Sequence, residues 1–187
     1  MKRLTLVPIL VCVASAYPAA QTPTQSPVYG VAPLASESAI VAKATLRDAQ
    51  GKVLGEAALR DSSAGVLVKL ELRNVPPGPH AFHIHTVGKC DAPDFTTAGG
   101  HFNPTTMKHG LLAAGGPHAG DMPNVFVPAD GTLSIEVLDS NVTLAAGSKS
   151  VFDADGSALM LHATADDYAS DPAGNAGGRI ACGVVSR

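Results

Sequence analysis

Six of the seven histidines lie between His80 and His118, in a stretch that is also rich in glycine and proline. A chain that needed only polar surface residues would scatter its histidines along its length. Imidazoles gathered in one stretch, with Asp121 three residues further on, are typical of metal ligands. Glycine and proline favour turns and loops of defined shape. The stretch therefore predicts a preformed metal site in a long ordered loop, and the fold must be one that can support such a loop.

The rest of the chain has the pattern of short strands. Apolar residues alternate with other residues over 66–73, a period of two that a helix would not show. The sequence has no tryptophan, 19 glycines and 14 prolines, which suits strands joined by turns better than long amphipathic helices. About eight strands predict an all-β fold, an antiparallel Greek-key β-sandwich or flattened barrel with two long functional loops. The expected strands are 39–47, 52–60, 66–73, 82–85, 124–127, 132–138, 158–162 and 180–185.

The first residues have the features of an export signal. A positive start, an apolar run and small residues follow one another, so residues 1–16 are predicted to be a signal peptide that is cleaved after Ala16. The apolar run is too short to span a bilayer, and we expect no membrane insertion after cleavage. A lipoprotein signal centred on Cys12 is the alternative, but Val11 stands where a small residue is expected. The protein is therefore expected in the periplasm or outside the cell.

Residues 17–37 are rich in proline, serine, threonine and alanine and show no periodicity. Such a segment cannot bury enough apolar surface to fold, so we predict a flexible linker, followed by one domain over 38–187. The net charge of −3, without a basic run beyond the first residues, argues against nucleic acid as a partner. Cleavage of the signal would leave Cys90 and Cys182, and an even pair in an exported protein is most simply a disulfide.

Two sets of candidate metal ligands can be separated by their spacing. His83 and His85 are two residues apart in a strand-like run, so both imidazoles can reach one metal from the same face. The loop that follows contributes three imidazoles and one carboxylate, a closed tetrahedral zinc set with no open position and hence a structural one. These residues are His101, His109, His118 and Asp121.

The first set is short of ligands. His162 stands in an apolar run near the C-terminus, where a buried imidazole would need a partner. It would complete a site with His83 and His85, and four imidazoles with room for a substrate favour copper, which accepts nitrogen ligands and cycles between Cu(II) and Cu(I). One histidine would then have to serve both metals, and the spacing does not say which.

These residues lie in segments that resemble the copper/zinc superoxide dismutase family in its exported bacterial form. The resemblance implies a β-sandwich enzyme with one copper and one zinc ion per subunit. It implies that superoxide is disproportionated to dioxygen and hydrogen peroxide by cycling between Cu(II) and Cu(I), with a structural zinc. The matching segments are GPHAFHIH at 78–85, AGGHFNP at 98–104, KHG at 108–110, HAGD at 118–121, LHATADD at 161–167 and GNAGGRIACGV at 174–184.

The resemblance also implies a role for each ligand. His101 would bridge the two metals and carry a proton during catalysis, which identifies the shared histidine. The copper ligands would be His83, His85, His101 and His162, and the zinc ligands would be His101, His109, His118 and Asp121.

Five further positions receive roles from the same resemblance. Asp166 would hydrogen-bond ligands of both metals and fix their tautomers. Arg179 would dock the superoxide anion beside the copper. His80 would brace the site without binding a metal. Cys90 and Cys182 would form a disulfide that ties the ligand-bearing loop to the last strand.

One loop departs from the animal and plant members of the family, which use lysines there to steer superoxide. Residues 163–178 contain three aspartates and no lysine. The lysines between the first copper ligand and the last zinc ligand are Lys89 and Lys108, so we expect these two to attract the substrate.

Two other functions fit parts of the sequence. A copper carrier or chaperone on the same fold would lack a ligand or Arg179 and contain a close cysteine pair, but every ligand position is filled and no C-x-C or C-x-x-C occurs. A binding module with only a structural zinc would leave His83, His85 and His162 without a purpose. An N-glycosylation sequon at Asn141 is a weak signal. No exposed apolar run marks a dimer face, so a homodimer stays an open alternative.

Overall fold

The structure is a computed structural model that describes residues 42–187. The predicted signal peptide (1–16), the predicted linker (17–37) and the first four residues of the predicted domain (38–41) lie outside the described residues. Within the part of the chain that the structure describes, no helix has the length and apolar character needed to cross a membrane.

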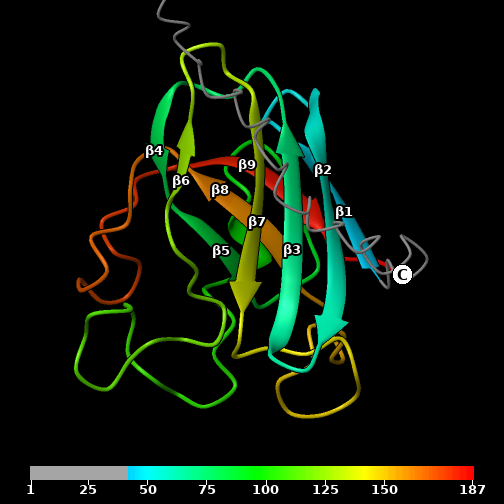
Figure 1. The fold of residues 1–187 in the computed structure, drawn as a ribbon, viewed down its shortest axis with the longest axis vertical. Helices are drawn as coiled ribbons and strands as arrows, with labels where there is room; N and C mark the ends of the chain where they lie inside the picture. Colours follow the sequence, from blue (N-terminus) through cyan, green and yellow to red (C-terminus); the bar gives the residue numbers. More distant parts are fainter. Residues whose placement is uncertain (1–41) are drawn as a thin grey trace, which may run out of the picture. The chain divides into compact units, whose positions relative to one another are not determined.

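The described residues form an all-β fold with long loops and one turn of 3-10 helix, which confirms the predicted fold class (Figure 1). Their strands are β1 (Ala42–Arg47), β2 (Val53–Ser62), β3 (Gly65–Leu72), β4 (Gly78–His80), β5 (Phe82–His85), β6 (Val125–Val127), β7 (Leu133–Asp139), β8 (Ala158–His162) and β9 (Arg179–Val184). The 3-10 helix η2 (Thr96–Ala98) lies in the loop after β5.

Seven strands form one antiparallel sheet in the order β5-β8-β9-β1-β2-β3-β7. Strand β3 lies beside one edge of this sheet and β5 forms the other edge, so the chain crosses over between them. It crosses again between β7, at the first edge, and β8, beside β5. These crossovers are connections of the Greek-key kind that the sequence predicts. Strands β4 and β6 pair with each other outside the large sheet.

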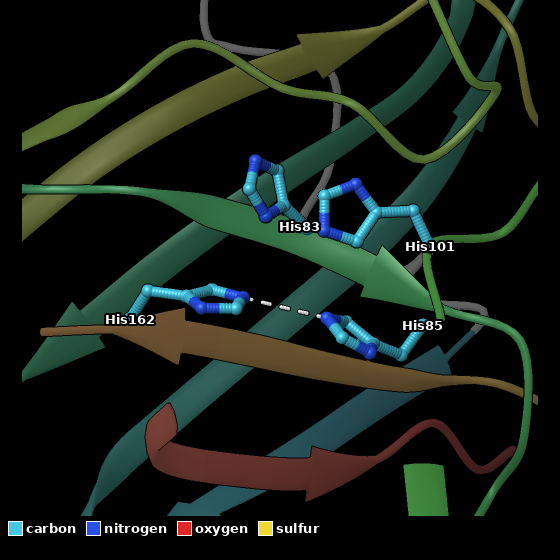
Figure 2. Close-up of side chains that lie close together, drawn as sticks. All are labelled: His83, His85, His101 and His162. Carbon is cyan, nitrogen blue, oxygen red and sulfur yellow. Dashed lines mark hydrogen bonds between the residues drawn. The ribbon is translucent and has the colours of Figure 1, made fainter. Parts of the chain in front are cut away.

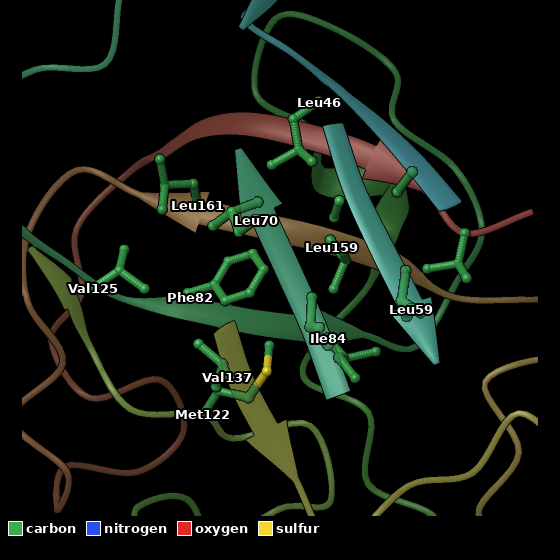
Figure 3. Packing of buried hydrophobic residues seen from close by; sticks show 14 of the residues in the cluster. Leu46, Leu59, Leu70, Phe82, Ile84, Met122, Val125, Val137, Leu159 and Leu161 are labelled. Atoms are coloured by element: carbon green, nitrogen blue, oxygen red, sulfur yellow. The ribbon is translucent and has the colours of Figure 1, made fainter. Parts of the chain in front are cut away.

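One apolar core is shared by strands from both edges of the sheet (Figure 3). Since β5 and β7 are opposite edges, a common core requires the sheet to curl until its edges approach each other. Burial of these side chains is the main favourable contribution to folding. Members of the core include Leu46 of β1, Leu59 of β2, Leu70 of β3, Phe82 of β5, Val137 of β7 and Leu159 of β8.

Strand β3 follows the alternation expected from the sequence. Its even-numbered residues from Val66 to Leu72 are buried, whereas Lys69 and Glu71 face solvent and form an ion pair of 2.8 Å. One face of the strand therefore packs against the core and the other is wet, as is typical of antiparallel sheets.

Strand β5 differs from β3 because both of its faces are buried. Phe82 and Ile84 belong to the core inside the sheet. Because alternate residues of a strand project to opposite faces, His83 and His85 face the outer side. There the loop after β5 covers them, so this short strand separates the core from a second buried region.

Strand β8 is buried on both faces as well. Leu161 belongs to the main core, whereas Met160 packs in a smaller cluster with Phe95 and Cys182. Cys182 forms the predicted disulfide with Cys90, with an S–S distance of 2.04 Å. This confirmed bond ties the loop after β5 to strand β9 on the outer side of the sheet.

The described residues contain one strand more than the eight that the sequence predicts. The additional strand is β4, in which Gly78, Pro79 and His80 pair with β6. The prolines around this point argue against a strand, because proline cannot donate a ladder hydrogen bond. Pro79 is accommodated because a two-stranded ribbon consists of edge strands, in which a residue needs a partner on one side only.

Candidate metal centre

Four buried histidines from three parts of the chain meet on the outer side of β5 (Figure 2). One ring nitrogen from each lies within 4.8 Å of the others. Nε2 of His85 lies 3.4 Å from Nε2 of His162, across the pairing of β5 with β8. Four convergent imidazoles can hold a transition metal. This four-histidine group consists of His83, His85, His101 and His162.

The loop after β5 returns to that strand at two places. Isolated backbone bridges pair His85 with His101 and His83 with Asp121. At Gly120 the loop comes so close that a Cβ would overlap the backbone of the strand. Glycine permits this approach because it has no side chain. Strand β5 therefore fixes the backbone positions of His101 and Asp121, the first and last loop residues of the site.

A second buried group lies in this loop and shares His101 with the first. Oδ1 of Asp121 lies 2.8 Å from Nδ1 of His101, 3.1 Å from Nδ1 of His109 and 3.3 Å from Nδ1 of His118. Three imidazoles and one carboxylate around one point form a closed tetrahedral zinc set. This three-histidine-aspartate group consists of His101, His109, His118 and Asp121.

Asp121 is held in place by the backbone of its own loop. Its Oδ2 accepts hydrogen bonds from the N–H groups of Gly110 and His118, both at 2.9 Å. Burial alone would raise the pKa of Asp121, but hydrogen bonds from His101 and Gly110 lower this pKa below its ordinary range. The side chain is therefore an anion, the form that binds a metal.

Three ring nitrogens in these groups are buried and have no hydrogen-bond partner among residues 42–187, which the structure describes. They are Nδ1 of His83, Nε2 of His101 and Nδ1 of His118. A buried polar atom without a partner costs free energy, so such atoms call for an explanation. A metal ion in each group would satisfy all three, and imidazole nitrogens are good ligands for copper and zinc. The residues present therefore fit both ions.

Three imidazoles of the four-histidine group, those of His83, His85 and His162, are neutral at neutral pH. Burial lowers the pKa of His83 from 6.5 to about 4 and that of His162 from 6.5 to about 3. Burial also lowers the pKa of His85. Neutral imidazole is the form that binds metals, because a protonated ring nitrogen has no lone pair to donate.

Asp166 connects the two groups. Its Oδ2 accepts a hydrogen bond from Nε2 of His83 at 2.9 Å, and its Oδ1 accepts one from Nε2 of His109 at 3.1 Å. A proton on Nε2 of each ring, facing Asp166, leaves Nδ1 for a metal. Burial alone would raise the pKa of Asp166, but these two hydrogen bonds lower it.

A pocket of about 440 Å³ opens onto the four-histidine group. His85, His101, His162 and Arg179 are among the residues that line it. The guanidinium of Arg179 donates to the carbonyl of Gly99 at 2.6 Å, and that carbonyl also accepts from Nδ1 of His85 at 2.9 Å. A permanent positive charge is therefore fixed on the pocket wall, where a small anion could bind.

The other candidates from the sequence lie around the centre. Both ring nitrogens of His80 lie 2.8 Å from carbonyl oxygens, those of His162 and Pro76, which leaves neither nitrogen for a metal. Lys89 and Lys108 are exposed, and neither is among the residues that line the pocket.

Sequence reasoning missed Asn124 and Tyr168. The side-chain amide of Asn124 forms hydrogen bonds with the backbone of Asp166. The backbone N–H of Asn124 donates to the hydroxyl of Tyr168. An asparagine that follows a proline has the appearance of a turn residue. The one available signal was its position three residues after Asp121.

The fold and the site together define an all-β protein in which two groups of candidate metal ligands share one histidine. Residues 50–185 match the family described as copper/zinc superoxide dismutase (SODC). The chain belongs to the copper/zinc superoxide dismutase family. This family uses copper and zinc, and the two groups offer a place for each ion.

Similar proteins come from bacteria. A copper/zinc superoxide dismutase of Aquifex aeolicus is 54% identical over 144 residues, which cover 76% of this chain and 85% of that protein. The crystal structure of a superoxide dismutase-like protein from Bacillus subtilis has a TM-score of 0.74 and 36% identity, covering 76% of this chain and 96% of that one. The copper/zinc superoxide dismutase from Brucella abortus has a TM-score of 0.65 and 29% identity, covering 77% and 98%.

Proposed function

We propose that the chain disproportionates superoxide to dioxygen and hydrogen peroxide at its paired metal groups. The observation that carries this proposal is the position of His101. Its Nδ1 faces Asp121 in the three-histidine-aspartate group, whereas its Nε2 is buried without a partner among the described residues and is left for the four-histidine group. An imidazole placed between two metals can hold and release a proton at one nitrogen while the other stays bound.

The donor sets support one metal for each group. Four imidazoles suit copper, and three imidazoles with a carboxylate suit zinc. When bound, copper supplies the one-electron couple between Cu(II) and Cu(I), and zinc supplies a fixed positive charge beside His101. The copper ligands would be His83, His85, His101 and His162, and the zinc ligands would be His101, His109, His118 and Asp121.

The surrounding side chains supply the proton and the docking charge. Two superoxide ions and two protons give one dioxygen and one hydrogen peroxide. His101 takes a proton at Nε2 in the half-reaction that releases dioxygen and donates it in the half-reaction that forms peroxide, and water supplies the second proton. Arg179 docks the anion. Asp166 fixes which nitrogen of His83 and of His109 carries the proton.

Metal analysis of the purified protein, together with measured superoxide consumption, tests this proposal. We expect one copper and one zinc per chain and rapid consumption. His101→Ala should keep the fold and lower the rate by at least about a thousandfold. Zinc alone without activity would indicate a binding module with a structural zinc, and bound copper without activity would indicate a copper carrier. Either result would contradict the proposal.

We also propose that the domain works outside the cytoplasm, in the periplasm or after secretion. The disulfide between Cys90 and Cys182 supports this location, because such bonds persist in oxidising compartments. N-terminal sequencing of the exported protein should begin at Tyr17, whereas a lipid on Cys12 or a cytoplasmic location would contradict the proposal. The chain would consist of a signal peptide (1–16), a linker (17–37) and the domain (38–187).

A further inference from the structure

Asp166 needs a fixed position because it serves two groups at once. It accepts hydrogen bonds from His83 and His109, which belong to different metal groups. Its own segment, residues 163–178, connects β8 to β9 without secondary structure. Connecting segments are mobile unless contacts from elsewhere hold them. In this protein such a contact comes from Asn124.

Asn124, from a distant part of the chain, forms two hydrogen bonds with the backbone of Asp166. Its Nδ2 donates to the carbonyl of Asp166 at 2.9 Å, and its Oδ1 accepts from the N–H of Asp166 at 2.8 Å. One amide side chain thus satisfies both backbone groups of one residue. Asn124 lies directly before β6 and 42 residues from Asp166, so the contact joins the end of one ligand-bearing loop to the other loop.

Tyr168 closes this arrangement. Its hydroxyl accepts a hydrogen bond from the N–H of Asn124 at 2.7 Å, and its own N–H donates to Oδ1 of Asp166 at 2.6 Å. Its carbonyl accepts from the N–H of Leu112 at 3.0 Å, in the loop that carries the three-histidine-aspartate group. The three residues therefore form a closed set of hydrogen bonds, the Asn124–Asp166–Tyr168 circuit.

We propose that Asn124, supported by Tyr168, is a positioning residue that orients His83 and His109 through Asp166. The inference rests on the proposed function in that it treats both groups as metal sites. Without the circuit, Asp166 would move, and each ring would lose the contact that directs its Nδ1 toward its group. Because one carboxylate serves both rings, a metal in one group changes the affinity of the other group, and this coupling is reciprocal.

Metal binding in the absence of superoxide tests this role. The zinc affinity of the metal-free protein is measured by competition with a chromophoric chelator, with and without bound copper. The visible spectrum of cobalt(II) in place of zinc reports the ligand geometry. Asn124→Ala removes the amide, and Tyr168→Phe removes one hydroxyl. Asn175→Gly is the control, because it removes two side-chain hydrogen bonds to Asp167 and Ser170 in the same loop, and glycine tolerates its φ of 52°.

We expect Asn124→Ala to raise the zinc Kd about tenfold and to alter the cobalt spectrum, as the loss of outer contacts to metal ligands does. Tyr168→Phe should raise the zinc Kd about threefold, because a single hydrogen bond is lost. In both variants bound copper should change the zinc Kd by a smaller factor than in the parent protein. Asn175→Gly should stay within about twofold of the parent, as exposed substitutions usually do.

The positioning role is overturned if Asn124→Ala folds and keeps the zinc affinity and cobalt spectrum of the parent. It is also overturned if Asn175→Gly changes both as strongly, because the effect would then be a general loosening of the loop. If Asn124→Ala does not fold, the same criteria apply to Tyr168→Phe. A parent protein that binds both metals but does not consume superoxide would contradict the proposed function and leave this test intact.

Discussion

The two metal groups are supported in different ways. Three members of the four-histidine group lie on strands, His83 and His85 on β5 and His162 on β8, whereas every member of the three-histidine-aspartate group lies in the loop after β5. The pleat of a strand sets the spacing of its side chains. A loop has no such spacing and depends on individual contacts, such as those that Asp121 accepts from Gly110.

From this difference we infer which of the two groups has its geometry before a metal binds. The strands are formed by the same burial that folds the core, so the four-histidine group should keep its geometry in the metal-free protein. The loop gains part of its order from the ligand set itself, because binding free energy is also ordering free energy. Zinc should therefore organise the loop, whereas copper should enter a site that is already formed.

Removal of one ligand from each group tests this difference most strongly. His162→Ala should abolish copper binding and lower superoxide consumption by at least about a thousandfold, because copper carries the electron. His118→Ala should lose zinc and lower the rate by only about ten- to a hundredfold, as the loss of a supporting contact does. Metal analysis and rate measurements check both values.

Amide hydrogen exchange of the same two variants separates the groups further. His118→Ala should speed exchange over residues 101–121, because local opening needs less free energy when the loop loses its zinc. His162→Ala should leave exchange there unchanged. Equal exchange rates over residues 101–121 in the two variants would show that the loop does not depend on the three-histidine-aspartate group for its order.

Acid should destabilise the metal-free protein mainly through the four-histidine group. Burial lowers the pKa of His83 to about 4 and that of His162 to about 3, from 6.5 for both. The unfolded chain therefore binds more protons below pH 6.5. The free energy of unfolding should fall as the pH falls from 6.5 toward 4, by up to about 1.4 kcal/mol per pH unit for each histidine.

Denaturant unfolding of the chelator-treated protein at several pH values measures this slope. His162→Gln should reduce the slope by the share of one histidine. His118→Gln should reduce it less, because the charge of Asp121 opposes the effect of burial on the pKa of His118. A slope that responds equally to the two variants would remove the distinction between the groups.

Gly174 tests the link between the groups, with a smaller effect. It has a φ of +61°, and a Cβ there would overlap the carboxylate of Asp166 and lie 2.7 Å from Nε2 of His109. Gly174→Ala should lower the free energy of unfolding by about 1–2 kcal/mol, because a left-handed conformation is unfavourable for alanine. It should also weaken zinc binding. Gly178→Ala is the control, because its Cβ would meet no atom within 4 Å, and a matching loss there would contradict this explanation.

The lysines should have the smallest effect. Lys89 follows the strand-held ligands and Lys108 directly precedes His109, so single replacements show which side of the centre attracts superoxide. Replacing both with glutamine should lower the rate by up to about fivefold at low salt, and the difference should vanish as salt screens the field. A rate and salt dependence equal to those of the parent would exclude steering by these side chains.

The strands and the strand-borne ligands of the four-histidine group could largely be predicted from the sequence, because the patterns that indicate them are local. The spacing of His83 and His85 fixes their common face, and the alternation over 66–73 predicts β3. The count of ligands requires one shared histidine, but the spacing does not identify it. The resemblance to the family names His101, and the structure places that residue in both groups.

The contacts that hold Asp166 in place could not be predicted, because they join residues that are far apart in the chain. Asn124 and Asp166 are 42 residues apart, and neither has a local pattern that indicates a partner. Strand β4 could not be predicted for a related reason. Pro79 argues against a strand unless it is known that β4 is an edge strand. Contacts of this kind depend on the completed topology.

Strands β5 and β8 each face the hydrophobic interior on one side and carry a histidine of the four-histidine group on the other. A change of volume at Ile84 or Leu161 shifts the backbone on which the neighbouring histidine is mounted, since packed interiors transmit small displacements. Leu46 and Leu70 lie on strands whose other face carries no ligand. Interior residues of β5 and β8 are therefore constrained both by folding and by catalysis. Substitutions there should accumulate more slowly during evolution than interior substitutions on β1 and β3.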